Sequence, residues 1–586
     1  MTFHFSPRTN RAHEIAWSQW GTAAFERARS EDKPVLLGIS AVWCHWCHVM
    51  DETTYSDPAV IAAINEHFVP IRVDNDRRPD INARYNQGGW PTTAFLSPDG
   101  VLLSGSTYVP TAQMLRALDE IARFYRERKD DIAARTADLA KASRAYPAAE
   151  SSDLDAAIPE NVLAALDRRY DEEYGGFGDA PKFPMVDALA FLVTEYLAKN
   201  NQRAYDMASG SLLGMARGGT YDHVEGGFFR YSTTRDWSIP HFEKMTEDHG
   251  GLIRALAELY AATRNDAFRS TLLSATGYVR DVLYDPATHR IAGSQDADEA
   301  YYELPLDERR ALTPPYIDRT SYTNWTAGIT GAWLAASYAL DDDSLAAHAC
   351  AVLDDLATTL DDGDGLLFHF IEPGGSPQVR GLLVDQAAYL RACLDAHEYT
   401  GHERFLERAS ATANALLRRL GAPDGGFYDR ENLSSEGALA IADRPLPENA
   451  SVADSLLRLA SMMGDAGLRA SAERTLRLYA NTYQGAGIFA APFARAIRRL
   501  ITPEVTVAIV GRVSETADFR EAARRLPGAL TCVVTLAPDK AELLEGRGLS
   551  ATASPAAYVC AGTICGAPVT DAAQLRAALD QVLASS

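Results

Sequence analysis

The sequence predicts a multidomain protein of mixed class, with an α/β domain at the N-terminus, a large all-α ring, and a small α/β unit at the C-terminus. In the first part of the chain, strand-like apolar runs alternate with helical periods. Helical periods then dominate and are broken by glycine-rich turns, and strand-like runs return after Ile501. We therefore divide the chain into residues 1–145, 155–500 and 501–586.

The N-terminal domain is expected to contain a mixed sheet flanked by helices. Helical periods cover residues 22–28 and 58–66, and strand-like runs cover 35–40, 68–74 and 93–96. Such alternation is typical of a layered α/β fold. The small and polar run 146–152 predicts the boundary to the next domain.

Two cysteines at CxxC spacing follow the first predicted strand. Cys44 and Cys47 enclose His45 and Trp46, and His48 comes next. The order predicts that both thiols lie at a strand-to-helix turn, where unpaired N–H groups and cationic neighbours stabilise a thiolate. We therefore expect a redox-active dithiol, with Cys44 as the nucleophile and Cys47 as the resolving thiol.

Other chemistries use similar residues. C-x-x-C-H also attaches c-type haem, but that chemistry requires export, and residues 1–10 lack the order of a signal peptide. A zinc site and an inert buried pair remain alternatives, although one helical turn cannot easily direct four ligands from five consecutive residues to one tetrahedral centre. We expect no metal and no cofactor.

A proline motif further along strengthens the redox interpretation. Gly88-Gly89-Trp90-Pro91 precedes a predicted strand that ends in a Pro-Asp-Gly turn. A cis Trp90-Pro91 bond beside the dithiol would leave backbone groups free to pair with an extended substrate. The alternative is an ordinary edge-strand proline. The residues expected to support the redox site are Trp43, His45, Trp46, His48, Trp90 and Pro91.

The middle of the chain predicts helical hairpins that close into a ring. Its glycine-rich turns recur at roughly 50 to 75 residues, a period that suits two helices and a loop; they cover 175–177, 226–228, 290–293, 363–367, 425–428 and 485–488. Six αα hairpins of this kind can form a closed double ring, in which each buries its apolar face against its neighbours. An open solenoid is the alternative.

Specific, ordered motifs run along nearly the whole chain and occupy 31–34, 44–50, 65–69, 73–74, 78–80, 88–91, 175–178, 180–184, 218–222, 226–228 and 240–245. With these motifs the chain resembles the YyaL and spermatogenesis-associated protein 20 family, whose N-terminal part is called DUF255. The resemblance implies a thioredoxin-like domain joined to an (α/α)6 toroid similar to that of N-acylglucosamine 2-epimerases and six-hairpin glycosidases. The family has a cysteine pair like Cys560 and Cys565. We expect both thiols to be reduced, and a regulatory disulfide is the alternative.

A second candidate site lies in the predicted toroid. His241 is a candidate general acid or base, and Glu243 is its candidate partner. Aromatic, acidic and imidazole side chains together suit a sugar-like ligand, and the further candidates for the toroid cavity are Asp222, His223, Trp237, Lys244, Asp248, Asp296 and Asp298. The alternative is that Glu243 and Lys244 form a structural ion pair and His241 caps a helix.

Composition excludes several partners. The formal net charge of −23 and pI near 5.0 would repel nucleic acid and anionic membranes. No apolar run is long enough to span a membrane, so we expect a cytoplasmic protein in which most of the seven cysteines are reduced.

The sequence thus predicts a thiol–disulfide oxidoreductase whose toroid binds substrate. The expected partners are a protein or small-molecule disulfide and a carbohydrate ligand. The alternatives are a sugar epimerase, isomerase or glycosidase-like enzyme with a regulatory thioredoxin domain, and a non-catalytic scaffold.

Overall fold

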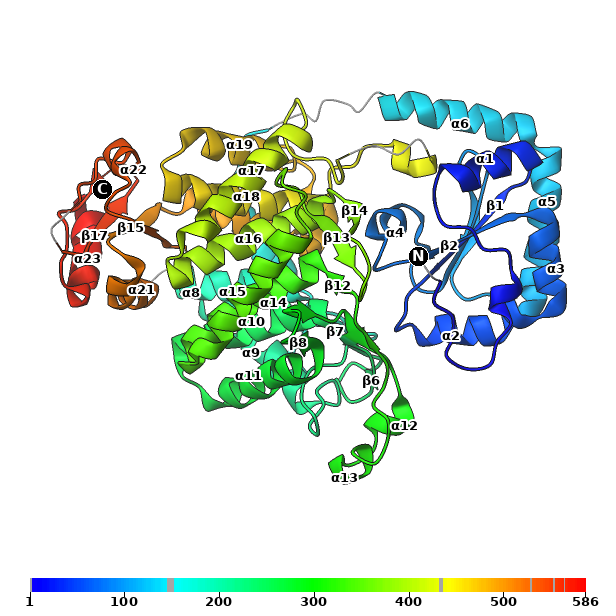
Figure 1. Cartoon of the computed structure of the whole chain (residues 1–586), viewed down its shortest axis with the longest axis horizontal. Helices are drawn as coiled ribbons and strands as arrows, with labels where there is room; N and C mark the ends of the chain where they lie inside the picture. Colours follow the sequence, from blue (N-terminus) through cyan, green and yellow to red (C-terminus); the bar gives the residue numbers. More distant parts are fainter. Residues whose placement is uncertain are drawn as a thin grey trace. The chain divides into compact units, whose positions relative to one another are not determined.

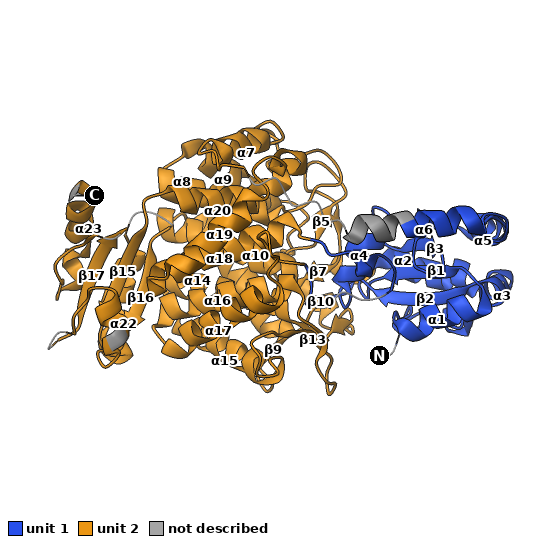
Figure 2. Ribbon diagram, turned by 90° about the horizontal axis from the view of Figure 1, so that it is seen from above, with its two compact units in different colours: residues 1–148, 295–298, 429–443 blue, residues 149–294, 299–428, 444–586 orange. Residues whose placement is uncertain are grey.

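The computed structural model describes residues 3–144, 152–431, 436–526, 530–551, 554–562 and 564–585. The chain forms two compact units (Figure 2). The first comprises Met1–Ala148, Gln295–Asp298 and Asp429–Asp443, and the second comprises Ala149–Ser294, Glu299–Tyr428 and Arg444–Ser586. The predicted boundary at 146–152 lies, apart from Ser152, outside the described residues.

A four-stranded sheet forms the centre of the first unit, in the order β2-β1-β3-β4 (Figure 1). β1 (Val35–Ser40) is parallel to β2 (Val69–Asp74) and antiparallel to β3 (Thr92–Leu96), which pairs with β4 (Leu102–Ser106). The mixed sheet predicted from sequence is therefore confirmed. The helices are α1 (Thr22–Glu31), α2 (His45–Glu52), α3 (Pro58–His67), α4 (Pro79–Tyr85), α5 (Thr111–Glu127) and α6 (Lys129–Arg144).

The sheet separates two hydrophobic cores, because successive residues of β1 point to opposite faces. Leu36 packs with Ile64 of α3 and Leu118 of α5 on one face. Leu37 packs with Phe25 of α1 and with other apolar residues on the opposite face. Both faces of the sheet are thus covered. The chain that follows β1 begins at the C-terminal end of this central strand.

A segment from far along the chain completes the second of these cores. Leu439 is fully buried in it. Arg84 donates hydrogen bonds to the carbonyl oxygens of Ala438 and Ile441, both at 3.0 Å, and the Tyr85 hydroxyl accepts one from the Ala438 N–H at 2.7 Å. The sequence had not indicated this packing, because Asp429–Asp443 is separated from the first domain by the helical region.

The helices of the second unit close into a ring. In the part of the chain that the structure describes, six inner helices pack side by side, and the last packs against the first: α8 (Val186–Lys199), α10 (Thr246–Thr263), α14 (Thr323–Leu340), α16 (Leu383–Thr400), α18 (Leu446–Met463) and α20 (Ala491–Ile501). The outer helices are α7 (Ile158–Asp167), α9 (Gln202–Arg217), α11 (Asp266–Tyr278), α15 (Asp343–Thr359), α17 (Glu403–Arg419) and α19 (Ala466–Arg477). Closure confirms the predicted toroid and excludes the open solenoid.

All the predicted glycine-rich turns lie on connections from an outer helix to the next inner helix. Four of them form short β-type pairings and a fifth pairs β8 (Tyr284–Asp285) with β9 (Arg290–Ile291), whereas the sixth lies in a 3-10 helix, Tyr483–Ala490. Connections in the other direction are short, with Asn200 and Asn201 alone between α8 and α9. The long loops therefore share one end of the ring.

The C-terminal residues form a second four-stranded sheet, in the order β16-β15-β17-β18. β15 (Val505–Val510) is parallel to β16 (Cys532–Leu536) and antiparallel to β17 (Ala556–Ala561), which pairs with β18 (Ile564–Cys565). Strand order and directions repeat those of the first sheet. Its helices are α21 (Ala517–Arg524), α22 (Ala541–Gly546) and α23 (Leu575–Ser585).

The expectation that Cys560 and Cys565 are reduced differs from the structure, which joins them in a disulfide. The two residues face each other directly across the β17–β18 pair, so their Cα atoms are only 4.0 Å apart. With Cys44–Cys47, four of the seven cysteines are bonded, and most are therefore not reduced.

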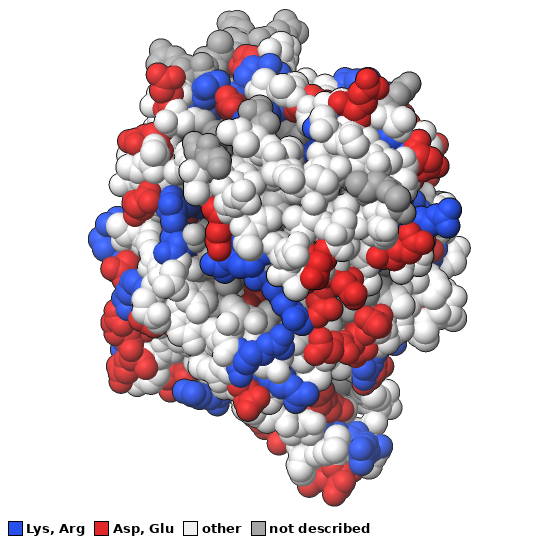
Figure 3. Space-filling view, turned by 90° about the vertical axis from the view of Figure 1, so that its left-hand side faces the viewer, with Lys and Arg blue, Asp and Glu red and all other residues white. Residues whose placement is uncertain are grey.

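The C-terminal sheet packs on the ring through polar contacts as well as apolar ones. The Nδ1–H of His397 on α16 donates to the carbonyl of His402 at 3.1 Å, and its Nε2 accepts the backbone N–H of Thr535 on β16 at 3.2 Å. On the face with this sheet, Lys and Arg side chains run across the middle and Asp and Glu side chains flank them (Figure 3). Among the described helices, none is long and apolar enough to cross a membrane.

Ring closure predicts a specific stability effect. The guanidinium of Arg498 on α20 pairs with the buried carboxylate of Glu195 on α8, at 2.6 and 3.0 Å. Glu195→Gln removes the buried partner charge of Arg498 and leaves only the exposed Glu160, 2.7 Å away, so it should cost about 3 kcal/mol. We expect calorimetry to show a clear fall in Tm, whereas Asp580→Asn, in an exposed pair with Arg576, should change stability by less than about 1 kcal/mol. Equal effects of the two changes would contradict the role assigned to Glu195.

His397 predicts acid sensitivity of the contact between ring and C-terminal sheet. Burial lowers the pKa of His397 to about 4, and its Nε2 can accept the Thr535 N–H only when the ring is neutral. Because the unfolded chain binds the proton more readily, stability is fully present above about pH 6.5 and is lost as pH falls toward about 4.

The measurement compares Tm at about pH 7.5 and about pH 5 in the parent and in His397→Asn. The fall should be smaller in the variant and should not vanish, since buried His249, with its pKa also lowered to about 4, titrates in the same range. An equal fall in both proteins would show that His397 does not carry the effect.

Candidate functional site

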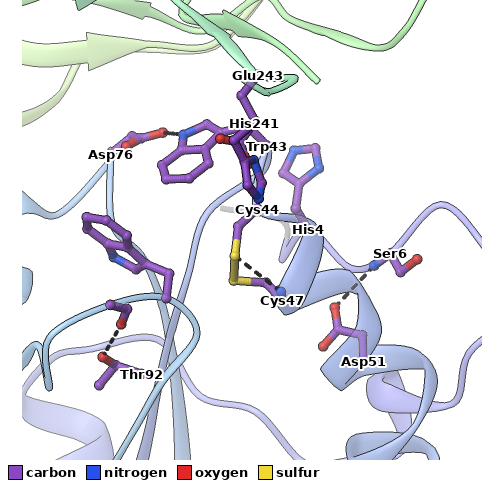
Figure 4. Close-up of a disulfide and its surroundings, with 12 residues drawn as sticks. His4, Ser6, Trp43, Cys44, Cys47, Asp51, Asp76, Thr92, His241 and Glu243 are labelled. Carbon is purple, nitrogen blue, oxygen red and sulfur yellow. Dashed lines mark hydrogen bonds and ion pairs between the residues drawn. A yellow bond between two sulfur atoms is a disulfide. The ribbon is translucent and has the colours of Figure 1, made fainter. Parts of the chain in front are cut away.

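The dithiol lies at the start of α2, as the CxxC spacing predicts (Figure 4). Cys44 is the residue that caps the helix, and its Sγ accepts a hydrogen bond from the backbone N–H of Cys47 at 3.2 Å. Both side chains are buried, and their sulfur atoms form a disulfide. The helix N-terminus therefore directs N–H groups at Sγ of Cys44, an arrangement that stabilises a thiolate once the disulfide is reduced.

Two tryptophans bring the CxxC and proline motifs together. Trp43 is buried and donates its Nε1–H to Asp76 Oδ2 at 2.6 Å. Its ring meets that of half-buried Trp90 edge to face, with centroids 5.7 Å apart. Asp76 is also held by the Asn75 side chain at 2.7 Å, so the Trp43 indole has a fixed orientation. No sequence motif indicated Asp76, which lies just after the end of β2.

The Trp90–Pro91 peptide is cis, as predicted. Pro91 is buried and directly precedes β3. Because β3 pairs with β1 on one side and β4 on the other, the alternative of an edge-strand proline is excluded.

An exposed aromatic surface adjoins the dithiol. Trp46 lies between the two cysteines in sequence and has half of its surface exposed. Its ring contacts those of His45 and Tyr108, with centroids 5.9 and 5.2 Å away. His48 is half-buried, and burial lowers its pKa, which favours the neutral imidazole. Tyr108 comes from the chain between β4 and α5, and no sequence signal marked it.

A buried ion pair fixes α2 from its other side. Asp51, which is 1% exposed, accepts two hydrogen bonds from the Arg72 guanidinium on β2, at 2.8 and 2.9 Å. It also accepts the Ser6 N–H at 3.1 Å. Bidentate pairs of this kind define geometry as well as energy, so the helix that carries the dithiol is anchored to the sheet.

The second candidate pair lies on a loop of the ring. His241 Nδ1 is 2.9 Å from Glu243 Oε1, and Arg230 lies 3.9 Å from the other carboxylate oxygen. The His241 ring stacks on Tyr231, which stacks in turn on the exposed ring of Phe183, at centroid distances of 4.9 and 4.7 Å. Half-buried His241 and buried Glu243 are thus brought together as predicted.

Asp222 and Lys244, which were predicted to line the toroid cavity, form a buried ion-pair cluster. Lys244 Nζ is 2.8 Å from Asp222 Oδ2, and Arg309 pairs with the same oxygen at 2.8 Å. The ammonium lies against the rings of Tyr278, Phe229 and Tyr302, and burial lowers the pKa of Lys244 to about 8. Neither Asp222 nor Lys244 has more than 3% of its surface exposed.

The preceding hairpin repeats this arrangement. Tyr170-Asp171 is followed by Gly175-Gly176-Phe177 at the same spacing as Tyr221-Asp222 is by Gly226-Gly227-Phe228. There the buried Lys182 pairs with Asp171 at 2.6 Å. Trp237 is buried over Lys182 and donates its indole N–H to the carbonyl of Tyr174 at 3.1 Å. The repetition assigns Asp222, Lys244 and Trp237 to holding the glycine-rich turns.

The remaining predicted residues lie in different surroundings. His223 is exposed, with Nε2 3.1 Å from the Gly218 carbonyl. Burial raises the pKa of Asp248, in the first turn of α10, to about 7. Asp296 and Asp298 belong to the segment that clusters with the first unit, not with the ring. In the described ranges, no group of three or more His, Cys, Asp or Glu side chains could hold a metal ion.

Comparisons with known proteins find relatives that are similar to parts of this chain. Residues 7–144 match the family model Thioredox_DsbH, described as a protein of unknown function, DUF255. Spermatogenesis-associated protein 20 of Homo sapiens is 33% identical over 337 residues, 51% of this chain and 42% of that protein. An uncharacterized protein of Caenorhabditis elegans is 31% identical over 306 residues, 49% of this chain and 41% of that protein. The chain thus spans less than half the length of these relatives, and the predicted resemblance is confirmed.

One shorter match and two solved structures add detail. The thiol:disulfide interchange protein DsbD of Pseudomonas fluorescens is 30% identical over 80 residues, 13% of this chain and 14% of that protein. Cellobiose 2-epimerase from Bacillus thermoamylovorans has a TM-score of 0.48 at 15% identity, covering 59% of this chain and 99% of the other. The cellobiose 2-epimerase of Spirochaeta thermophila has a TM-score of 0.46 at 15% identity, covering 59% and 98%.

The buried Asp222–Lys244 pair and the half-buried His241–Glu243 pair predict stability losses of different size. Asp222→Asn removes the carboxylate shared by Lys244 and Arg309. The buried Lys244 charge is then left unpaired, although Arg309 keeps Glu225 at 3.0 Å, and the loss should cost about 3 to 5 kcal/mol. His241→Ala, on the half-buried stack, should cost about 1 kcal/mol. Thermal unfolding of both variants, with Asp171→Asn as the matched change in the preceding hairpin, measures this. A stable Asp222→Asn protein would contradict the structural role of the pair.

Proposed function

We propose that the Cys44–Cys47 dithiol carries out thiol–disulfide exchange. The observation that carries the proposal is the position of Cys44 at the N-terminus of α2, with the Cys47 N–H directed at its sulfur. Helix N-termini lower the pKa of cysteine, and the thiolate is the form that attacks disulfides. Cys47 lies inside the first turn and serves as the resolving thiol.

In the proposed reaction the Cys44 thiolate attacks one sulfur of a substrate disulfide. The substrate S–S bond breaks, a mixed disulfide with Cys44 forms, and the leaving thiolate takes a proton from solvent. The Cys47 thiolate then attacks Sγ of Cys44, which releases the second substrate thiol and forms the Cys44–Cys47 disulfide. The substrate gains two electrons, and an external thiol reductant must restore the dithiol.

Two observations support this chemistry over an inert cysteine pair. Exposed Trp46 and neighbouring Tyr108 give a substrate an aromatic surface next to buried sulfur atoms. The name of the partly similar DsbD protein describes thiol:disulfide interchange. As part of the proposal we place the protein in the cytoplasm, where thiol reductants are abundant, with a protein or small-molecule disulfide as substrate.

The toroid is proposed to bind the substrate, including a carbohydrate ligand. A second candidate function, a sugar epimerase, isomerase or glycosidase-like activity, is favoured by one observation: His241 has a carboxylate partner and stacks on Tyr231, at a position open to solvent on one side. Imidazole–carboxylate pairs transfer protons near neutral pH, and aromatic rings stack on sugars.

The exchange proposal predicts a covalent trap. In Cys47→Ser the mixed disulfide on Cys44 cannot be resolved, so it should accumulate under oxidative stress and be detected by mass spectrometry after acid quenching. Cys350→Ser is the matched control, because Cys350 is unbonded and half-buried, and burial raises its pKa to about 11. Trapped adducts in the control and none in Cys47→Ser would refute the proposal.

Activity assays separate the two candidate functions. Insulin reduction by the full chain should be lost in Cys44→Ser and retained in His241→Ala. If instead a saccharide from a panel is turned over, and that turnover is lost in His241→Ala alone, the second function is supported. Absence of both activities would favour a scaffold.

A further inference from the structure

The inner helices of the ring surround two adjoining cavities of about 560 and 320 Å³. Both are lined by Asp187, Arg254, Arg391, Asp395 and Arg495, so these side chains lie where the two cavities adjoin. The smaller reaches the first turns of the inner helices, and the larger reaches Arg524 and Val533 of the C-terminal sheet region. Volumes in this range hold small-molecule ligands.

Charged residues four positions apart line this space on four inner helices, where one helix face repeats. The pairs are Arg254 and Glu258, Arg391 and Asp395, Asp454 and Arg458, and Arg495 and Arg499. Charged side chains enter protein interiors only when they are paired or when they bind something. The partners of each arginine therefore show whether the site is complete.

Four of the five arginines have carboxylate partners. Asp395 accepts from Arg254 at 2.5 Å and from Arg458 at 2.7 Å. Asp454 accepts from Arg495 and Arg499, both at 2.6 Å. Each buried aspartate is thus shared by two guanidinium groups, and the Arg pairs hold the pKa of both carboxyls well below their usual range.

Arg391 is different. It makes no hydrogen bond and no ion pair within 4 Å with any residue that the structure describes, and its Nε is fully buried. Burial and the neighbouring Arg254 and Arg495 lower its pKa well below the usual value. Asp187 of α8 lines the same cavities but lies beyond ion-pair distance, and burial raises the pKa of its carboxyl. Asp395 and Asp454 also attract the Arg391 charge, but each already pairs with two other arginines. An anion bound in the cavity would therefore supply the direct partner that Arg391 lacks among the described residues.

We propose that the ring cavity binds a small phosphate-bearing ligand, whose anionic group pairs with Arg391 between Arg254 and Arg495. Guanidinium groups hold phosphate oxygens bidentately, which suits a cluster of arginines better than of lysines. The net charge of −23 repels anions from the protein as a whole, so non-specific attraction does not account for such a site. The proposal is independent of the dithiol, because binding here needs no redox chemistry.

Titration calorimetry of the full chain in phosphate-free buffer tests it, with glucose 6-phosphate, inorganic phosphate and glucose as probes. Binding of both phosphate compounds, or of glucose 6-phosphate alone, supports the proposal, and the two results distinguish a site for phosphate itself from one that also needs the sugar. No binding of either phosphate compound, or equal binding of glucose, overturns it.

Substitutions of Arg391 test whether this residue binds the phosphate group. Arg391→Met should weaken the bound probe about tenfold or more, and Arg391→Lys should weaken it less. Arg404→Met is the matched control, since Arg404 pairs with Asp354 on the outer helices and away from the cavity, and it should leave affinity unchanged.

The Tm of Arg391→Met without ligand provides a second measurement. If Arg391 is kept for a ligand, removing its unpaired charge should leave Tm equal or higher, and the probe should raise the Tm of the parent only. A marked fall in Tm without ligand, or unchanged affinity in Arg391→Met, would show that the residue is structural and would overturn the proposal.

Discussion

The ring of helices depends on closure. Each inner helix buries one flank against its predecessor and one against its successor, so the ring is complete only when α20 packs on α8, where the Arg498–Glu195 pair lies. The two ends of the ring differ, because every connection from an outer helix to the next inner helix lies at the same end. That end carries the His241–Glu243 pair, whereas the other end receives the C-terminal sheet through His397.

Buried charge serves two purposes in this framework. In the first two glycine-rich turns a buried lysine pairs with an aspartate of a repeated motif, so Lys182 and Lys244 hold equivalent loops. Inside the ring, Asp395 and Asp454 each join arginines from different inner helices. Since breaking such a pair leaves an uncompensated charge, these contacts define register between helices. Among the residues that the structure describes, Arg391 alone of the five cavity arginines on these helices has no carboxylate partner, and the proposed binding role rests on this exception.

Short sequence motifs correctly predicted the structural features that depend on residues close together in the chain. The CxxC spacing located Cys44 at the start of α2, and Pro91 before β3 indicated the cis bond. The turns at Gly175 and Gly226 predicted the hairpins. Contacts between distant residues were not predictable: Leu439 in the first core, Asp51 with Arg72, and Cys560 facing Cys565 depend on tertiary packing or strand register. The sequence also could not distinguish Lys244, which is fully buried and structural, from His241, which is half-buried, because their roles depend on burial in the folded chain.

In the proposed exchange, the N-terminus of α2 makes Cys44 the reactive thiol. This role is measured by the rate of iodoacetamide alkylation of Cys44 and Cys47 in the reduced protein as a function of pH, read by peptide mass spectrometry. We expect Cys44 to react first, with an apparent pKa well below the value of about 8.5 for a free cysteine. Alkylation of Cys44 no faster than that of Cys47, with an apparent pKa at or above about 8.5, would contradict it.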